Sequence, residues 1–330
     1  MLIDRAHHAS GLSSIERLAC EWTWRQPGPK IGRMTNEVVC PACASSQTRR
    51  WSDGVGEPIF LCRRCGTAFY KRPVAQAHDY GTYYPYLAAF DDHEFQRQLD
   101  LRRARFRFQL REIERLRPPG RRLIDFGAGP GYFCAIAREL GWDAAAIESS
   151  PVAIKAGSSA FRVPFISLDE LTDASCSVIT AFHVIEHLED PTVVLRKLHR
   201  KLETGGILVV HVPNRESLSS LLSYSYRKLV TGSATRSGCL YYPEHLTGFT
   251  ESGLITCASR ARFSIIRSRN CSLYSRFYDS WVIPTYLSEL KGNFSKGYRP
   301  LIRRALSGLI DLVGCPINRG DWLIAHFRAQ

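Results

Sequence analysis

Residues 123–131 read LIDFGAGPG and are the most informative part of this chain for its fold class. A short apolar run containing an acid leads into three closely spaced glycines, and a helical pattern begins at Tyr132. Glycines let the backbone approach a ligand that Cβ atoms would keep away, and a helix N-terminus offers free N–H groups. The stretch therefore predicts a strand, a ligand-binding loop and a helix, an arrangement that dinucleotide-binding folds also use.

Apolar runs and amphipathic runs alternate on the C-terminal side of this loop. Strands are expected over 122–126, 144–147, 163–166, 177–182 and 207–212, and helices over 132–140, 152–159 and 191–202. A further helix is expected over 250–260, and strands over 263–268 and 322–327. Such alternation predicts an α/β fold, a doubly wound and mostly parallel sheet with helices on both faces.

Two Cys-x-x-Cys pairs precede this region. Cys40, Cys43, Cys62 and Cys65 have the spacing of a four-thiolate zinc site, in which each pair sits on a tight turn. The alternatives are redox dithiols or unrelated thiols. A closed shell of four thiolates leaves no open position, so the sequence predicts a structural Zn²⁺ in a small N-terminal zinc ribbon. Zinc would give this short segment the stability that burial cannot supply.

The chain divides into four expected parts. Residues 1–36 form a poorly structured N-terminal extension, 37–72 the zinc ribbon, 73–118 a linker and basic helix, and 119–330 the α/β domain. The 330 residues include 44 Lys+Arg against 31 Asp+Glu, a formal net charge of +13. This surplus favours an anionic partner without choosing among nucleotides, RNA, phosphorylated sugars and membranes. Ordinary hydrophobic content excludes a wholly disordered or fibrous chain.

Several motifs together resemble the class I S-adenosylmethionine-dependent methyltransferases. They are DFGAGPG at 125–131, Glu148-Ser-Ser after the second expected strand, HVIEHLEDP at 183–191 and Pro-Asn at 213–214. The resemblance covers residues 119–330. It implies a seven-stranded sheet whose last strand is antiparallel, and S-adenosyl-L-methionine as the cofactor. An acid at the end of a second strand also suits both hydroxyls of a ribose.

The resemblance also implies which residues hold this cofactor. The glycine loop would hold the methionine part, Glu148 the ribose, and the residues after the third expected strand the adenine. The implied cofactor-binding residues are Asp125, Gly127, Ala128, Gly129, Gly131, Glu148, Ser149, Leu168, Asp169 and His183.

Residues 183–187 read His-Val-Ile-Glu-His, which also matches the H-x-x-E-H pattern of inverted metalloproteases. That pattern needs both histidines on one helix. Here His183 directly follows an expected strand, and Pro191 begins the next helix. We therefore interpret His183 as a residue at the mouth of the sheet, near the cofactor and a candidate for catalysis.

Glu244 and His245 are adjacent in a stretch that reads YYPEHLTGFT at 241–250. They follow the fifth expected strand and so are expected at the carboxyl edge, where open α/β sheets bind ligands. A histidine can accept a proton near neutral pH. The stretch is similar to one in zinc-ribbon methyltransferases of deoxysugar and polysaccharide pathways, which implies a His near the substrate. His245 is thus a candidate general base, with a substrate-positioning or a structural role as alternatives.

Three functions remain open at this point. The first is methyl transfer to a hydroxyl or carbon of a small molecule, such as a sugar, nucleotide-sugar or glycolipid-type acceptor that can be anionic or phosphorylated. The second is an RNA methyltransferase using the zinc ribbon and the Arg-rich helix 93–117. The third is a non-catalytic cofactor-binding module. No run of 18 apolar residues occurs. A cytoplasmic protein is therefore expected, with the basic amphipathic stretch 299–313 either covering the sheet or contacting a membrane surface.

Overall fold

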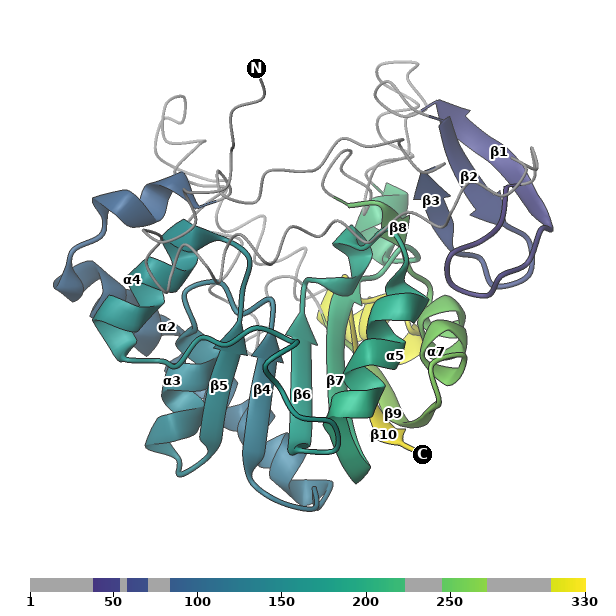
Figure 1. Cartoon of the computed structure of the whole chain (residues 1–330). Coiled ribbons are helices and arrows are strands. Elements are labelled where there is room, and N and C mark those ends of the chain that lie inside the picture. The colour runs from purple at the N-terminus through teal and green to yellow at the C-terminus, as the bar shows by residue number, and fades with distance from the viewer. Residues whose placement is uncertain (1–37, 54–57, 71–83, 223–244, 272–309) are drawn as a thin grey trace, which may run out of the picture.

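A computed structural model describes residues 38–53, 58–70, 84–222, 245–271 and 310–330. Its centre is a six-stranded sheet in the order β5-β4-β6-β7-β10-β9 (Figure 1). These strands are β4 (Arg122–Phe126), β5 (Asp143–Ile147), β6 (Cys176–Phe182), β7 (Leu202–Pro213), β9 (Phe263–Cys271) and β10 (Trp322–Ala329). The order reverses between β4 and β6, which places a ligand crevice beyond the carboxyl ends of these two strands.

The sheet is mostly parallel, as the alternation of strands and helices predicts. β4 pairs in parallel with β5 and β6, and β6 with β7. β10 is antiparallel to both of its neighbours, β7 and β9. The expected antiparallel last strand is therefore confirmed.

The expectation of seven strands is wrong for the described residues, which form six. The segment expected as a strand at 163–166 is reduced to one parallel bridge between Ala146 and Phe165. Ala146 still donates its N–H to Pro164 O at 2.9 Å and accepts from Ile166 N at 2.9 Å. A proline has no N–H to donate, and the chain then turns at once. The segment thus occupies the seventh-strand position without extending the ladder.

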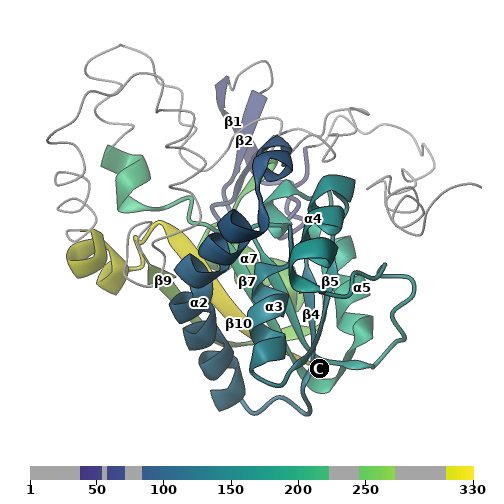
Figure 2. The ribbon, with the colours of Figure 1, turned by 90° about the vertical axis from the view of Figure 1, so that its left-hand side faces the viewer.

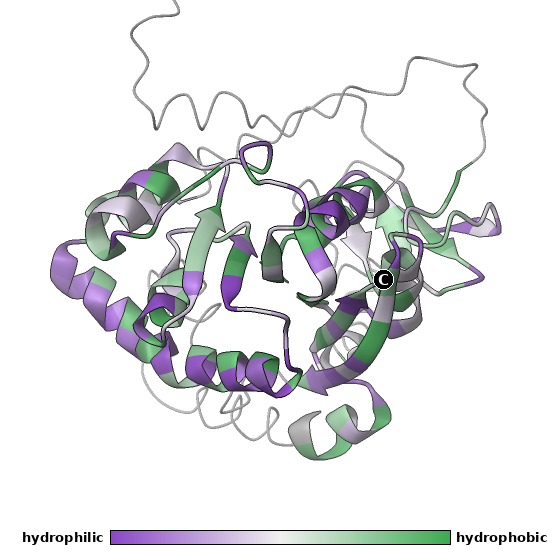
Figure 3. Cartoon of the chain, turned by 60° about the horizontal axis from the view of Figure 1, so that its bottom comes forward, coloured by the Kyte–Doolittle hydropathy of each residue, from purple (hydrophilic) through white to green (hydrophobic). Residues whose placement is uncertain are grey.

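Helices cover both faces of the sheet (Figures 1 and 2). One face carries α2 (Asp92–Arg115), α3 (Tyr132–Glu139) and α4 (Pro151–Phe161), and the other carries α5 (Pro191–Lys201) and α7 (Glu251–Ser259). Shorter elements are η2 (Pro85–Ala89), η3 (Ile185–His187), η4 (Ile310–Gly314) and η5 (Cys315–Ile317). The helices show green and purple faces in Figure 3, as amphipathic helices on a sheet must.

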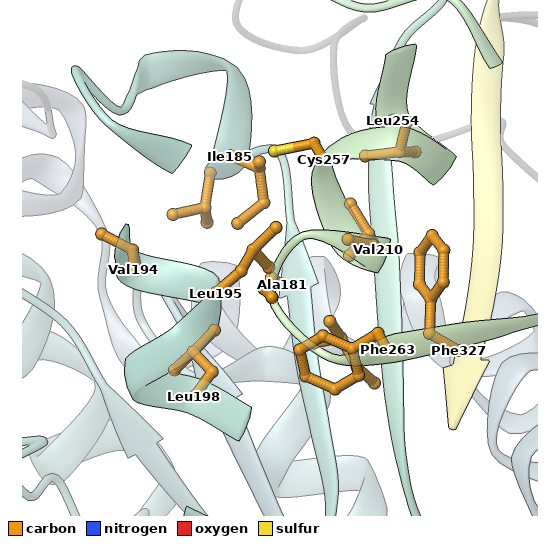
Figure 4. Close-up of a cluster of buried hydrophobic side chains, with 14 of the residues drawn as sticks. Ala181, Ile185, Val194, Leu195, Leu198, Val210, Leu254, Cys257, Phe263 and Phe327 are labelled. Carbon is orange, nitrogen blue, oxygen red and sulfur yellow. The ribbon is translucent and has the colours of Figure 1, made fainter. Parts of the chain in front are cut away.

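Apolar side chains from α5, α7 and the central strands meet in one core (Figure 4). Leu195 and Leu198 of α5 are fully buried and lie opposite Cys257 of α7 and Phe263 of β9. The leucines lie three residues apart, which places them on one side of the helix. Asp190 caps α5 by accepting from Val193 N at 3.1 Å. This core fixes the strand ends from which the site loops leave.

The cysteine-bearing segment forms a small antiparallel sheet. It contains β1 (Thr48–Asp53), β2 (Pro58–Cys62) and β3 (Ala68–Tyr70), and its fourth strand is β8 (Thr247–Gly248). β3 pairs with β8 through Ala68↔Gly248 and Phe69↔Thr247, so the two sheets are tied together just after His245 (Figure 1). No local pattern in the sequence predicts this pairing.

The cysteine-bearing segment also packs on α5 and α7. Arg260 donates to the carbonyls of Pro41 at 3.3 Å and Ala42 at 3.0 Å, and Thr250 Oγ1 donates to Cys65 O at 2.6 Å. Among the described residues, no helix is both long and apolar enough to cross a membrane. The extension 1–36, Glu244 and most of the stretch 299–313 lie outside the described residues.

Candidate functional site

The glycine loop forms the turn between β4 and α3. Gly127, Gly129 and Gly131 have φ values of 74°, 55° and 78°, a region that costs an L-residue roughly 1–2 kcal/mol. A Cβ on Gly127 would lie 2.3 Å from Val184 Cγ2, and one on Gly129 would lie 3.2 Å from the Tyr84 hydroxyl. The sequence needs glycine here both for the backbone conformation and for the close packing of the loop against Val184 and Tyr84.

Asp125 is buried near the end of β4, beneath this loop. Its Oδ1 accepts a hydrogen bond of 2.6 Å from Thr180 Oγ1 on β6. Burial raises the pKa of Asp125 to about 7, with a further rise from the charge of Glu148 and an opposing effect from Thr180. A bound cationic group would relieve this cost, because it favours the ionised carboxylate.

Glu148 follows β5 and reaches back to the glycine loop. Its carboxylate accepts from Gly129 N at 2.7 Å, Ser149 N at 2.7 Å and Ser150 N at 2.9 Å. Burial raises the pKa of Glu148, while these backbone N–H groups act in the opposite direction. The structure thus brings Glu148 to the loop that the motifs associate with it.

The remaining residues assigned to the cofactor by resemblance lie at the same edge. Ser149 Oγ lies 3.3 Å from Glu148 Oε1, Leu168 is buried, and Asp169 is exposed in the turn after the Phe165 bridge. The ribose and adenine assignments stay predictions.

A small cavity opens beside the glycine loop. Its lining includes four residues that the sequence motifs assign to the cofactor site, namely Asp125, Gly127, Ala128 and His183. Arg105 lines it as well. This arginine on α2 was expected only as part of a basic helix, and it is 7% exposed. Sequence spacing cannot show that an arginine more than twenty residues upstream faces the loop.

His183 lies at the end of β6 with a φ of 59°, which turns the chain sharply. Its N–H donates to His211 O at 2.9 Å, and its ring lies edge-on to Trp322 with centroids 4.4 Å apart. Burial lowers the pKa of His183 to about 3, with a further effect from the positive charge of Arg105. A neutral imidazole thus faces the cavity at physiological pH.

A second group of polar side chains lies beside His183. Glu186 and His187 belong to η3, and His245 precedes β8. The rings of His187 and His245 meet edge to face, with centroids 4.7 Å apart. Leu246 N donates to Glu186 O at 2.9 Å, which ties the two segments together. His187 was not among the expected site residues. Its spacing of four residues from His183 in the sequence was the signal that could have identified it.

The four cysteines come together as their spacing predicts. Cys40 Sγ lies 3.6 Å from Cys65 Sγ, and Cys43 Sγ lies 3.5 Å from Cys62 Sγ. All four thiols are buried and lie within 4.8 Å of one another. Four converging sulfurs at these distances match the donor set and size of a tetrahedral zinc site. The cluster supports the zinc prediction without identifying the metal.

We expect Cys62→Ser to lose the zinc of this cluster and to lower the melting temperature by roughly 10 °C or more, because metal binding stabilises such segments. Metal analysis and thermal denaturation would measure this. Cys271→Ser, outside the cluster, is the matched control and should keep the zinc. Equal zinc content in Cys62→Ser and the unmodified protein would contradict the assignment.

Residues 96–268 match a family model described as a methyltransferase domain. The match covers more than half of the chain, and the chain belongs to this family. The strand order and the glycine loop agree with this membership of the methyltransferase-domain family.

The curated relatives are similar over part of their length. A ubiquinone biosynthesis O-methyltransferase of Xanthomonas axonopodis pv. citri is 30% identical over 111 residues, which are 31% of this chain and 46% of that protein. That of Paracidovorax citrulli is 25% identical over 161 residues, 46% of this chain and 66% of that protein. The chain thus spans about half to two thirds of the length of these relatives.

Solved methyltransferase structures also match. A possible histamine N-methyltransferase from Thermotoga maritima has 17% identity and a TM-score of 0.43, over 72% of this chain and 96% of that chain. The 1,6-didemethyltoxoflavin-N1-methyltransferase of Burkholderia thailandensis, with S-adenosylhomocysteine bound, has 16% identity and a TM-score of 0.42, over 81% of this chain and 96% of that chain.

Proposed function

We propose that this enzyme methylates a hydroxyl or carbon of a small molecule, of the sugar, nucleotide-sugar or glycolipid type. The observation that carries the proposal is the position of His183. It lines the cavity at the glycine loop, and its Nδ1 lies 3.5 Å from Glu186 Oε1 in the group that also contains His187 and His245. The cavity expected to hold the cofactor therefore lies next to polar side chains that could bind an acceptor or take up its proton.

S-adenosylmethionine, when bound, supplies a methyl group on a positively charged sulfur. Asp125 and the loop Gly127–Gly131 would hold its methionine part, and Glu148 would hold its ribose. Neutral His183 lines this pocket, and its ring packs against Trp322 behind it. Methyl transfer is an in-line displacement, so the main task of these residues is alignment.

His245 would activate the acceptor by receiving the proton of its hydroxyl or acidic carbon. It lies at the carboxyl edge of the sheet, and the pairing of β3 with β8 holds the segment that follows it. Glu244, the other candidate from this stretch, lies outside the described residues. The relatives from ubiquinone biosynthesis are O-methyltransferases, which supports oxygen as the methylated atom.

The RNA alternative is less favoured by the charges of α2. Arg97 pairs with Glu94, Arg103 with Glu139, and Arg115 with Glu112. Arg102 and Arg105 are buried against the fold. These five side chains serve contacts within the protein. Of the α2 arginines, Arg107 and Arg111 are exposed as well, so only part of the charge of this helix is left for a nucleic-acid surface.

We expect His245→Ala to lower kcat by about 10²–10⁴-fold, the usual contribution of a general base, with little change in cofactor affinity. Initial rates and calorimetric cofactor binding would separate the two effects. His199→Ala is the matched control, because His199 lies on α5 and contacts Gln330 O at 3.1 Å. An unchanged kcat in His245→Ala would remove His245 from the proton step.

The acceptor class is tested with S-adenosylmethionine labelled on its methyl group. The purified enzyme and a cell extract are incubated with it, and the nucleic-acid, lipid and water-soluble fractions are counted. Label in the soluble or lipid fraction that disappears with Asp125→Ala supports the proposal. Label in RNA would replace it with the RNA alternative, and cofactor binding without any label would favour a non-catalytic module.

A further inference from the structure

Three side chains from two distant segments converge beside the cofactor cavity. Glu186 and His187 come from η3, and His245 comes from the segment before β8, 58 positions further along the chain. Each offers one ligand atom, and these three atoms lie within 4.8 Å of one another. Ligands of one Zn²⁺-sized ion lie about 2.0–2.2 Å from it, so small side-chain rotations would bring all three to one centre.

The carboxylate of Glu186 is the independent sign of a missing ligand. Glu186 is 0% exposed, and neither of its oxygens has a hydrogen-bond partner among the described residues. The Nδ1 atom of His183, a neutral imidazole, lies 3.5 Å from Glu186 Oε1. Burying a carboxylate without partners costs several kcal/mol. A bound proton or a bound cation can offset this cost, and the two imidazoles whose nitrogens lie within 4.8 Å of the carboxylate favour the cation.

We propose that Glu186, His187 and His245 bind a divalent transition-metal ion, separate from the zinc of the cysteine cluster. One carboxylate oxygen and two imidazole nitrogens are the donor set typical of Zn²⁺, Mn²⁺, Fe²⁺ and Co²⁺ sites. His187 and His245 are partly exposed, while Glu186 lies beneath them, so the open side of the ion faces outward. Three protein ligands and an open position are typical of a catalytic site.

The inference also deepens the proposed function, on which this step rests. An acceptor hydroxyl at the open position would be acidified by the ion. Its O–H bond would break, with the proton passing to water, and an oxygen lone pair would form the new bond to the methyl carbon. The electron pair of the breaking sulfur–methyl bond would stay on sulfur. His245 would then act as a ligand, and the ion would perform the activation that a free His245 would perform as a base.

Binding of Mn²⁺ to the zinc-loaded protein tests the site without acceptor or cofactor. Loss of the free-ion electron paramagnetic resonance signal on titration should show one bound Mn²⁺ per chain, which added Zn²⁺ displaces. Glu186→Gln, His187→Gln and His245→Gln should each weaken binding at least about tenfold. His199→Gln should not change it. Zinc content and cofactor affinity would show that each variant retains its fold.

Two results would overturn the site: no Mn²⁺ or Zn²⁺ bound beyond the cysteine cluster at millimolar concentration, or binding unchanged in Glu186→Gln and His245→Gln. The proposed function fails separately. A protein that binds Mn²⁺ through these residues but transfers no methyl group keeps the metal site and loses the enzyme proposal. Methyl transfer that depends on His245 without any second metal ion would make His245 a base and exclude the ion.

Discussion

Replacing Asp125 with asparagine should weaken S-adenosylmethionine binding by roughly 10- to 100-fold and, at pH 8, stabilise the cofactor-free protein. A charge-assisted hydrogen bond contributes about 1.5–3 kcal/mol, which gives the expected loss of affinity. The amide is close in shape to the carboxyl group, and its oxygen can still accept from Thr180. Calorimetric titration and thermal denaturation would measure the two effects.

The stabilising effect follows from the direction of the pKa shift. Asp125 has a pKa of about 7 in the folded protein, against an ordinary value of 3.8. Because the folded protein holds this proton more tightly than the unfolded chain, the associated stability is fully present below about pH 4. It is lost as the pH rises through 7. The difference between the two pKa values corresponds to at most about 4 kcal/mol. We therefore expect Asp125→Asn to stabilise by about 1–3 kcal/mol at pH 8 and by little at pH 4.

The pH dependence of binding provides the control. In the unmodified enzyme, cofactor affinity should fall as the pH drops below 7, because the carboxyl group becomes protonated. Asp125→Asn should remove this dependence. Equal affinity at pH 6 and pH 8 in the unmodified enzyme would show that Asp125 does not hold the cofactor through its charge.

Gly127→Ala should reduce both cofactor affinity and turnover by at least about tenfold. The added Cβ would lie 2.3 Å from Val184 Cγ2, and the φ of 74° adds about 1–2 kcal/mol of strain. Val184 lies between His183 and η3 in the chain. A displacement of Val184 would therefore move both His183 in the cavity wall and Glu186 in η3. Cofactor titration, initial rates and unfolding free energy would be measured on the same preparation.

Gly141 offers a matched control for this substitution. Its φ is 78°, and an added Cβ would meet nothing within 4 Å. Gly141→Ala should therefore destabilise by the backbone strain alone and leave cofactor affinity unchanged. Combining Gly127→Ala with Val184→Ala should recover part of the lost affinity. Identical behaviour of the two glycine variants would mean that strain, and not contact with Val184, governs the loop.

The order of strands and helices followed from local patterns. The β-branched run 207–212 and the leucines of α5 carry their own periodicity. The bounds of α5 were therefore predicted within one residue and the C-terminal half of β7 was predicted, but β7 begins at Leu202, five residues before the expected start. The strand expected at 163–166 was the exception. Its apolar pattern is adequate, but Pro164 cannot donate to a ladder and the chain turns immediately afterwards.

Some residues of the candidate site could likewise be predicted from local patterns, and others could not. Short spacings identified the glycine loop and the four cysteines, because neighbours in a tight turn must be close in space. The approach of Arg105 to that loop and the meeting of Glu186 with His245 depend on how α2 and β8 pack. Local sequence patterns do not predict contacts between such distant segments.

The α/β alternation, the glycine loop and the clustering of four thiols could all be predicted from the sequence, since each depends on residues within one turn or one strand–helix unit. The pairing of β8 with the cysteine-bearing sheet, and with it the position of His245 beside Glu186 and His187, depends on tertiary packing. The physical reason is that a strand as short as Thr247–Gly248 has almost no periodicity of its own and is defined by the hydrogen bonds of its partner strand.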